Sequence, residues 1–185
     1  HPFNGFMNIK DIVVNSSNIG AAKIAKKIGK HNQKEFFKKI GFYDKLDVEI
    51  FEAAKPYTNP NHWGEVETMT IGYGHGFSVT PMHLVSAYAT LINNGQKSEL
   101  TFLFNNSTSD HHQIIKKETS EFFLKLLRSV ILKTKYTGPR AEIKGYEIGG
   151  KTGTSMLIDK FGRYQKDKNL TSFIGVFPIS QPKYL

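Results

Sequence analysis

The segments YEIGGKTGTS at residues 146–155 and LTSFIGVFPI at residues 170–179 decide the fold that this sequence predicts. The second segment is rich in β-branched and aromatic residues, which favour strands. A polar stretch, Asp159–Asn169, separates the two segments and suits the connection of a hairpin. Two antiparallel strands are therefore expected late in the chain.

Two helices are predicted before residue 41. The first follows an irregular segment that starts at residue 8, and it ends at Gly29. Its apolar residues recur at helical spacing and comprise Ile19, Ala22, Ala25 and Ile28. The second is expected to begin with Asn32 as its N-cap. The side chains that it should bury are Phe36, Phe37 and Ile40. Residues 44–76 show little periodicity, so a long ordered loop or a small subdomain is predicted there.

The clearest helix signal lies at residues 80–95, where Thr80 is the expected N-cap and Pro81 the first helical residue. Its apolar stripe should consist of Leu84, Tyr88, Leu91 and Ile92. Another helix is predicted over residues 118–133. Its inward residues should be Phe122, Phe123, Leu126, Leu127, Val130 and Ile131. Residues 100–104 are expected to form a short strand, followed by a polar turn at 105–112.

Helices that precede a late hairpin predict an α+β fold with helices packed on an antiparallel sheet. The length of 185 residues suits one domain, so residues 1–185 are expected to belong to a single one. No run of eighteen apolar residues is present, and no segment is predicted to span a bilayer. The absence of cysteine excludes disulfides and thiolate metal sites.

The formal net charge of +9 is compatible with nucleic acid, an anionic membrane surface or an anionic substrate as partner. Lysines spread along the chain on solvated faces also explain it. No helix-turn-helix, RNA-binding aromatic motif or zinc pattern accompanies the charge, so no nucleic acid partner is expected. The seven histidines lack metal-binding helical spacing and are expected to be solvated, with His75 serving as a turn residue. Trp63 is expected in the core.

Two short motifs could carry chemistry. The first is Lys151-Thr152-Gly153-Thr154, on a predicted strand. The second is Ser16-Ser17-Asn18, which ends an apolar run at residues 12–14 and opens a helix. Enzymes that use an activated serine as nucleophile carry such Lys-Thr-Gly and Ser-x-Asn motifs in this context. A third segment, GYGHGFSVTP at residues 72–81, lies between them.

Taken together, these segments resemble the class B penicillin-binding proteins, notably the cell-division type. The resemblance covers most of the chain and is weakest at residues 30–65 and 96–116. It implies a penicillin-binding/serine β-lactamase-like transpeptidase fold, incomplete in this chain. The implied activity is peptidoglycan cross-linking by serine acyl transfer to D-Ala-D-Ala stem peptides, with no cofactor and no metal. A β-lactamase or carboxypeptidase shares the Lys-Thr-Gly and Ser-x-Asn motifs, and the GYG…TP segment favours the transpeptidase.

The resemblance also implies partners and a location for the intact protein. These are the peptidoglycan stem peptide, β-lactam antibiotics and divisome proteins, at the periplasmic face of the bacterial inner membrane. A membrane anchor is expected outside this chain.

The roles of individual residues follow from the resemblance. Ser16 would relay a proton toward the leaving amine, and Asn18 would bind the substrate amide, whereas Ser17 should point away. Lys151 would place a cation beside the cleft. Thr152 and Thr154 would bind the terminal carboxylate of the substrate. Thr154 would also be catalytic, with its backbone N–H as half of the oxyanion hole. Gly153 would let the substrate backbone approach the strand, beside Ser155 as a further substrate-binding residue.

The nucleophile of this family lies in a Ser-x-x-Lys motif that precedes the Ser-x-Asn triplet. The first fifteen residues contain no such motif, and the one literal match is Ser180-Gln181-Pro182-Lys183. Pro182 disfavours a helical Gln181, so Ser180 and Lys183 should not share a helical face. The chain is therefore expected to lack the nucleophile helix and the first strands, and to be inactive alone.

One alternative rests on a different motif. Residues Gly145–Thr152 match the phosphate-binding pattern G-x-x-x-x-G-K-[ST]. That loop needs an apolar strand before it and a helix after it. Residues 139–144 make a poor buried strand and residues 153–155 a poor helix start, which argues against a nucleotide site.

Overall fold

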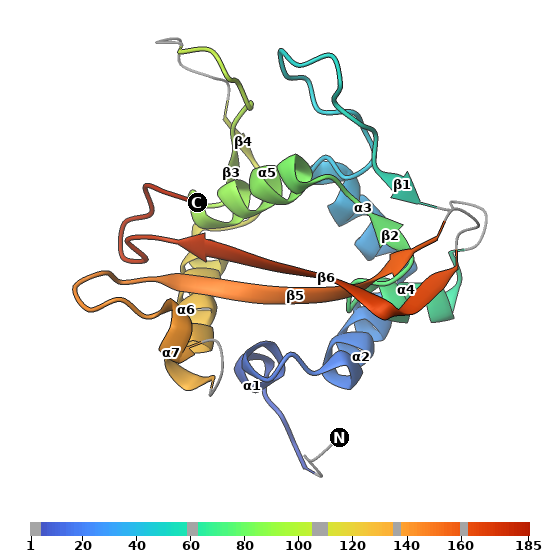
Figure 1. The fold of residues 1–185 in the computed structure, drawn as a ribbon, viewed down its shortest axis with the longest axis horizontal. Helices are drawn as coiled ribbons and strands as arrows, with labels where there is room; N and C mark the ends of the chain where they lie inside the picture. The colour runs from blue at the N-terminus through green and yellow to red at the C-terminus, as the bar shows by residue number, and fades with distance from the viewer. Residues whose placement is uncertain (1–4, 59–62, 105–110, 135–137, 160–162) are drawn as a thin grey trace. The chain divides into compact units, whose positions relative to one another are not determined.

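The computed structural model describes residues 5–58, 63–104, 111–134, 138–159 and 163–185 (Figure 1). The chain divides into two compact parts. The first contains the N-terminal residues up to Ser16 and the residues from Lys125 to the C-terminus, and the second contains Ser17–Leu124. Helix α6, Lys117–Lys133, contributes residues to both parts. The architecture combines helices with small antiparallel sheets, which confirms the predicted α+β class.

The first part is built on the hairpin of β5, Gly149–Ile158, and β6, Tyr164–Val176. The strands pair antiparallel, with Gly149 opposite Val176 and Ser155 opposite Leu170. The prediction placed the second strand at 170–179, whereas β6 begins six residues earlier, inside the polar stretch expected to be the connection. A two-stranded ribbon leaves much of its surface in water, so polar side chains do not end the strand there.

Three helical elements accompany this hairpin: α1 (Ile9–Val14), the second half of α6, and α7 (Gly138–Ala141). Four α6 residues are buried as predicted: Leu126, Leu127, Val130 and Ile131. A Cβ added to Gly149 would lie 3.1 Å from Leu127 Cβ, so α6 packs directly on the start of β5. Helix α1 was not predicted, because its six residues are too few for helical spacing to show. Asn8 caps it by accepting a hydrogen bond from the Asp11 amide.

The second part contains four complete helices, the first half of α6 and two short sheets among its described residues. The helices are α2 (Asn18–Ile28), α3 (Lys30–Lys39), α4 (Glu65–Ile71) and α5 (Pro81–Ile92). The strands are β1 (Tyr57–Thr58), β2 (Phe77–Ser78), β3 (Gln96–Lys97) and β4 (His112–Gln113). Strands β1 and β2 pair antiparallel, as do β3 and β4.

Several predictions for this part were wrong at their boundaries. Helix α3 begins at Lys30 after Gly29, and Asn32 lies inside it, donating to the Ile28 carbonyl instead of capping. The segment predicted as a long ordered loop or a small subdomain contains α4, a seven-residue helix, so only the loop alternative was wrong. Along α2, Ala22 and Ala25 are buried as expected. The flanking Ile19 and Ile28 are exposed.

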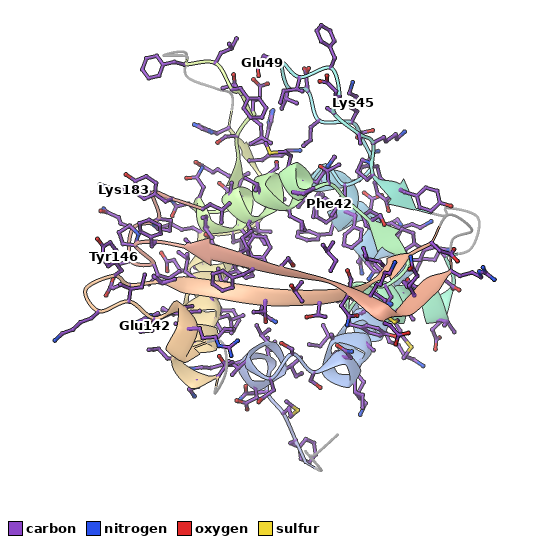
Figure 2. All side chains as sticks on the ribbon, in the orientation of Figure 1. Phe42, Lys45, Glu49, Glu142, Tyr146 and Lys183 are labelled. Carbon is purple, nitrogen blue, oxygen red and sulfur yellow. The ribbon has the colours of Figure 1, made fainter. Side chains whose placement is uncertain are left out.

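Residues 100–104 do not form the predicted strand. The Phe102 amide donates to the Glu49 carboxylate at 3.0 Å, and the Thr101 hydroxyl donates to the other carboxylate oxygen. Because Glu49 takes the Phe102 donor, that donor is not available for a ladder. These hydrogen bonds lower the pKa of Glu49, with the Thr101 bond as the largest cause. Glu49 thereby ties the segment after Tyr43 to residues 101–102 (Figure 2).

An aromatic cluster forms the core around α3 and α4. Its rings are Phe37, Phe42, Tyr43, Trp63 and Phe77, with centroids 5.0–6.4 Å apart in the contacting pairs. Trp63 is 3% exposed, which confirms its predicted burial. Its Nε1 donates to Gln33 Oε1 at 3.2 Å, and Gln33 Nε2 donates to the Thr68 carbonyl at 3.1 Å. Trp63, Gln33 and the Thr68 carbonyl therefore satisfy one another, whereas the buried Tyr43 hydroxyl has no hydrogen-bond partner among the described residues.

The GYG…TP segment leads from α4 to α5. A Cβ on Gly72 would lie 2.5 Å from Ala25 Cβ, so the first glycine of the motif lets α4 end against α2. Gly74 and Gly76 have φ values of 98° and 79°, which favour glycine. Thr80 caps α5 and Pro81 is its first residue, as predicted.

The buried face of α5 differs from the predicted stripe. Leu84 is exposed, and the buried residues are His83, Ser86, Ala87 and Thr90. His83 Nε2 lies 3.0 Å from the Asp44 carbonyl and Nδ1 2.7 Å from Thr80 Oγ1. The expectation that all histidines are solvated was therefore wrong for His83. Phe122 of α6 is also exposed, contrary to its predicted inward position.

Replacing the buried indole tests this core. Trp63→Ala should lower the free energy of unfolding by about 3–5 kcal/mol, because it leaves a cavity and removes the donor to Gln33. Urea denaturation of the 185-residue chain measures this. Phe51→Ala is the matched control, since Phe51 is 95% exposed and should change stability by less than about 0.5 kcal/mol. Equal effects of both substitutions would contradict the described core.

Candidate functional site

Ser16 occupies the junction between α1 and α2. Helix α1 ends at Val14 with Asn15 as its C-cap, and Ser16 has a φ of 48°, which is uncommon for a residue with a side chain. Ser17 follows as the buried N-cap of α2, and its hydroxyl accepts from the Gly20 amide at 3.2 Å. The two neighbouring serines therefore differ. The Ser17 hydroxyl caps the helix, a role that was not predicted for it, and Ser16 is exposed.

Lys151 is the third residue of β5 and reaches Ser16 across the sequence. Its Nζ donates to Ser16 Oγ at 2.6 Å and to the Thr152 carbonyl at 2.9 Å. The serine and the lysine are separated by 135 positions and lie in the same compact part. Burial lowers the pKa of Lys151. The structure thus joins the first residue of the Ser-x-Asn triplet to the lysine of the Lys-Thr-Gly-Thr motif.

The residues after Lys151 are exposed along β5. They are Thr152, Gly153, Thr154 and Ser155. The ladder with β6 is regular from Gly149 to Met156, so alternate side chains point to opposite faces of the ribbon. Thr152 and Thr154 share one face, where two hydroxyls can approach the same ligand group. Lys151 and Ser155 lie on the other face.

One edge of β5 is bonded to β6, and among the described residues no strand pairs with its other edge. A strand edge of this kind presents amides and carbonyls that can pair with an extended peptide. A Cβ on Gly153 would lie 2.7 Å from Ser172 Oγ. That hydroxyl can rotate away, so the backbone does not require glycine at this position. The glycine leaves the surface of the strand free of a side chain.

Asn18 is the first residue of α2 and is exposed. It belongs to the second compact part, whereas Ser16 and Lys151 belong to the first. The hydrogen bond described at the candidate site joins Ser16 and Lys151, both within the first part.

The phosphate-binding alternative requires a loop that ends in a helix at residues 150–152. Residues 149–152 instead lie within β5, and the strand continues to Ile158. The amides of this stretch are directed along a sheet and do not form a concave cradle, so the geometry contradicts a P-loop. The literal Ser-x-x-Lys match at 180–183 is not helical either, in agreement with the prediction.

The described residues contain no group of three histidine, cysteine, aspartate or glutamate side chains placed to hold a metal ion. Among them, no helix is both long and apolar enough to cross a bilayer.

Arg128 is a residue near the site that the sequence analysis missed. Arg128 interrupts the apolar pattern of α6. A charged residue between Leu127 and Val130 was the signal in the sequence that could have pointed to a specific partner.

Glycines at the start of β5 were also missed. A Cβ on Gly150 would lie 2.6 Å from the Ile174 carbonyl oxygen and 2.6 Å from the Phe173 ring. Gly150 therefore permits the close pairing that precedes Lys151. Its signal was the Gly-Gly dipeptide inside a predicted strand, which indicates close backbone approach.

Comparison with known proteins places this geometry in a family. Residues 2–185 match the model of the penicillin-binding protein transpeptidase domain. The probable peptidoglycan D,D-transpeptidase FtsI of Caulobacter vibrioides is 29% identical, over 98% of this chain and 31% of the relative. Stage V sporulation protein D of Bacillus subtilis is also 29% identical, over 97% of this chain and 29% of the relative.

Solved structures agree. The apo transpeptidase domain of penicillin-binding protein 3 from Burkholderia pseudomallei superimposes with a TM-score of 0.86 at 28% identity. That match covers 96% of this chain and 54% of the other. The chain thus spans about a third of the curated relatives and about half of the solved domain. It belongs to the family of the penicillin-binding protein transpeptidase domain, in the class B branch that contains the FtsI proteins.

Proposed function

We propose that this chain supplies the Ser-x-Asn and Lys-Thr-Gly-Thr elements of a peptidoglycan D,D-transpeptidase active site. The observation that carries the proposal is the 2.6 Å hydrogen bond between Lys151 Nζ and Ser16 Oγ. A relay serine needs a fixed hydrogen-bond partner to hold its hydroxyl in one direction. Lys151 provides that partner and places a positive charge beside it.

The substrate of this reaction is a stem peptide that ends in D-Ala-D-Ala. An activated serine attacks the penultimate carbonyl, the terminal D-Ala leaves with a proton on its amine, and a second peptide amine resolves the acyl-enzyme. Ser16 delivers the proton to the leaving amine. Lys151 attracts the terminal carboxylate of the donor peptide, and its cation helps keep the general-base lysine neutral.

Features of β5 support a role in binding the peptide. Thr152 and Thr154 share a face, so both hydroxyls can donate to one carboxylate. The free edge of β5 can pair with an extended peptide backbone over Gly153. Ser155 contributes from the opposite face, and Asn18 binds the substrate amide. In this proposal, residues 1–185 form a portion of one transpeptidase domain.

The remaining proposals for the intact protein follow from the relatives that carry the name FtsI. It is a serine-type D,D-transpeptidase sensitive to β-lactams, and it works with divisome proteins at the periplasmic face of the inner membrane, held there by an anchor outside these residues. One solved relative from Mycobacterium is a complex with ampicillin, which is consistent with such sensitivity. The nucleophilic serine and the general-base lysine also lie outside these residues.

Removing the relay hydroxyl should slow acylation of the intact protein. Ser16→Ala is expected to lower the second-order rate constant for benzylpenicillin by about a hundredfold, which is typical for the loss of one proton-transfer group. Mass spectrometry of the acyl-enzyme over time measures the rate. Ser180→Ala is the matched control, since Ser180 is exposed and lies off any helix. A rate unchanged by Ser16→Ala would refute the relay role.

The charge of Lys151 should set the alkaline limit of acylation. Because burial lowers the pKa of Lys151, the ammonium loses its proton at a lower pH than an ordinary lysine does. Activity that needs the cation is present below this pKa and falls as the pH rises through it. In Lys151→Arg, residual activity should persist to higher pH, because arginine stays charged. Identical pH profiles for both proteins would argue against a cationic role.

The 185-residue chain by itself should not react covalently with penicillin. Loss of a nucleophilic serine costs on the order of 10⁶ in rate in serine proteases. Intact-mass measurement after incubation with benzylpenicillin is expected to show no penicilloyl adduct, whereas the intact protein should gain one. An adduct on the isolated chain would show that a serine within these residues is the nucleophile.

A further inference from the structure

Arg128 makes three hydrogen bonds near the start of β5. Its Nη1 donates to Glu142 Oε2 at 2.5 Å, and its Nη2 donates to Glu142 Oε1 at 2.8 Å. The same Nη1 donates to the Ile148 carbonyl at 2.8 Å. The fork of the guanidinium matches the two carboxylate oxygens, a geometry that lysine cannot reproduce. One side chain of α6 therefore holds both ends of residues 142–148, the segment that leads into β5.

The Ile148 carbonyl lies just outside the β ladder. The register of β5 and β6 starts at Gly149 opposite Val176. Arg128 thus supplies a donor at the position where the partner strand no longer provides one. The next residue is Gly149, where an added Cβ would collide with Ile179 and lie 3.1 Å from Leu127 Cβ of α6. Gly149 therefore packs closely against both residues. The start of β5 is fixed by one charged contact and one close-packed contact.

The segment held by Arg128 has its own internal bonds. Ile143 and Tyr146 form a bridge around Gly145, whose φ is 89°. The Ile179 amide donates to the Glu147 carbonyl at 2.7 Å. Glu142 follows α7 and Tyr146 stands on the turn before β5 (Figure 2). The first of these contacts is local and the second leads to the segment after β6, whereas Arg128 ties residues 142–148 to α6.

We propose that Arg128 is a positioning residue for transpeptidation. By holding the Ile148 carbonyl, Arg128 fixes the position of β5 along α6. In that position Lys151 Nζ reaches Ser16 Oγ. Ile148 directly precedes β5 and Lys151 is the third residue of that strand, so a shift at Ile148 is passed on to the Lys151 Cα. This inference rests on the proposed function, because it assigns Arg128 to the same site.

Pairing with Glu142 keeps the guanidinium in place. The hydrogen bonds from Arg128 lower the pKa of Glu142. Glu142 is charged above its pKa, so the pair persists through neutral pH. Other charges near Arg128 include Glu147, whose negative charge also favours the guanidinium.

The test uses the intact protein and three substitutions at this contact or beside it. Arg128→Ala should lower the acylation rate constant for benzylpenicillin by about ten- to a hundredfold, since a displacement of about 1 Å has such effects. Arg128→Lys should recover only part of the rate. Arg140→Ala is the matched control, because Arg140 is an exposed arginine on α7, and it should leave the rate within twofold.

Two readouts separate positioning from a general loss of stability. In Arg128→Ala the alkaline limb of the acylation profile should move to higher pH, because a displaced Lys151 is more hydrated. Hydrogen exchange at the Gly149 and Gly150 amides should also become faster, whereas exchange at the amides of α5 should not change. A lower melting temperature with an unchanged pH profile and unchanged exchange would overturn the proposal.

The exchange measurement also distinguishes the two levels of inference. If the unsubstituted intact protein is not acylated, the proposed function fails. Faster exchange at Gly149 in Arg128→Ala would still support the anchoring of β5, and unchanged exchange would overturn it. If the unsubstituted protein is acylated and Arg128→Ala is acylated equally fast, only the positioning role is refuted.

Discussion

The hydrogen bond between Lys151 Nζ and Ser16 Oγ is the contact on which the site depends. It joins a strand near the end of the chain to a turn near its beginning, within one compact part. Neither partner is in an ordinary environment. Ser16 has a positive φ between two helices, and burial lowers the pKa of Lys151. Backbone strain and desolvation of this kind concentrate at functional sites, because structure elsewhere must compensate for them.

Close packing around β5 explains how the lysine is held. Gly149 and Gly150 have no room for a Cβ, the first because of Leu127 and Ile179 and the second because of the Ile174 carbonyl. A strand without side chains at these two positions can approach α6 and β6 together. Arg128 adds a directional contact at the same place. Apolar packing sets the distance of β5 from α6, and the guanidinium resists sliding along it.

The second compact part follows a different principle. Trp63, Gln33 and the Thr68 carbonyl form a buried chain of hydrogen bonds inside an aromatic cluster. His83 has a similar role on the buried face of α5, where it bonds to Thr80 and the Asp44 carbonyl. Each of these polar groups is satisfied by another segment, so they specify how the segments pack. Residues with polar side chains thereby replace part of the apolar stripe that helical spacing predicts.

Patterns within a few residues were enough to predict the elements whose signals are local. Thr80 and Pro81 predict the start of α5, because an N-cap side chain and the fixed φ of proline act within one helical turn. The apolar spacing of α6 and the β-branched run of β6 are equally local signals. The motifs also identified Ser16 and Lys151 as candidates for one site. The folded chain was needed to show that Phe102 donates to Glu49 instead of entering a strand, that β6 extends through a polar stretch, and that Arg128 holds Ile148. Each of these depends on which groups meet after folding, and no local pattern encodes which group will satisfy a given donor.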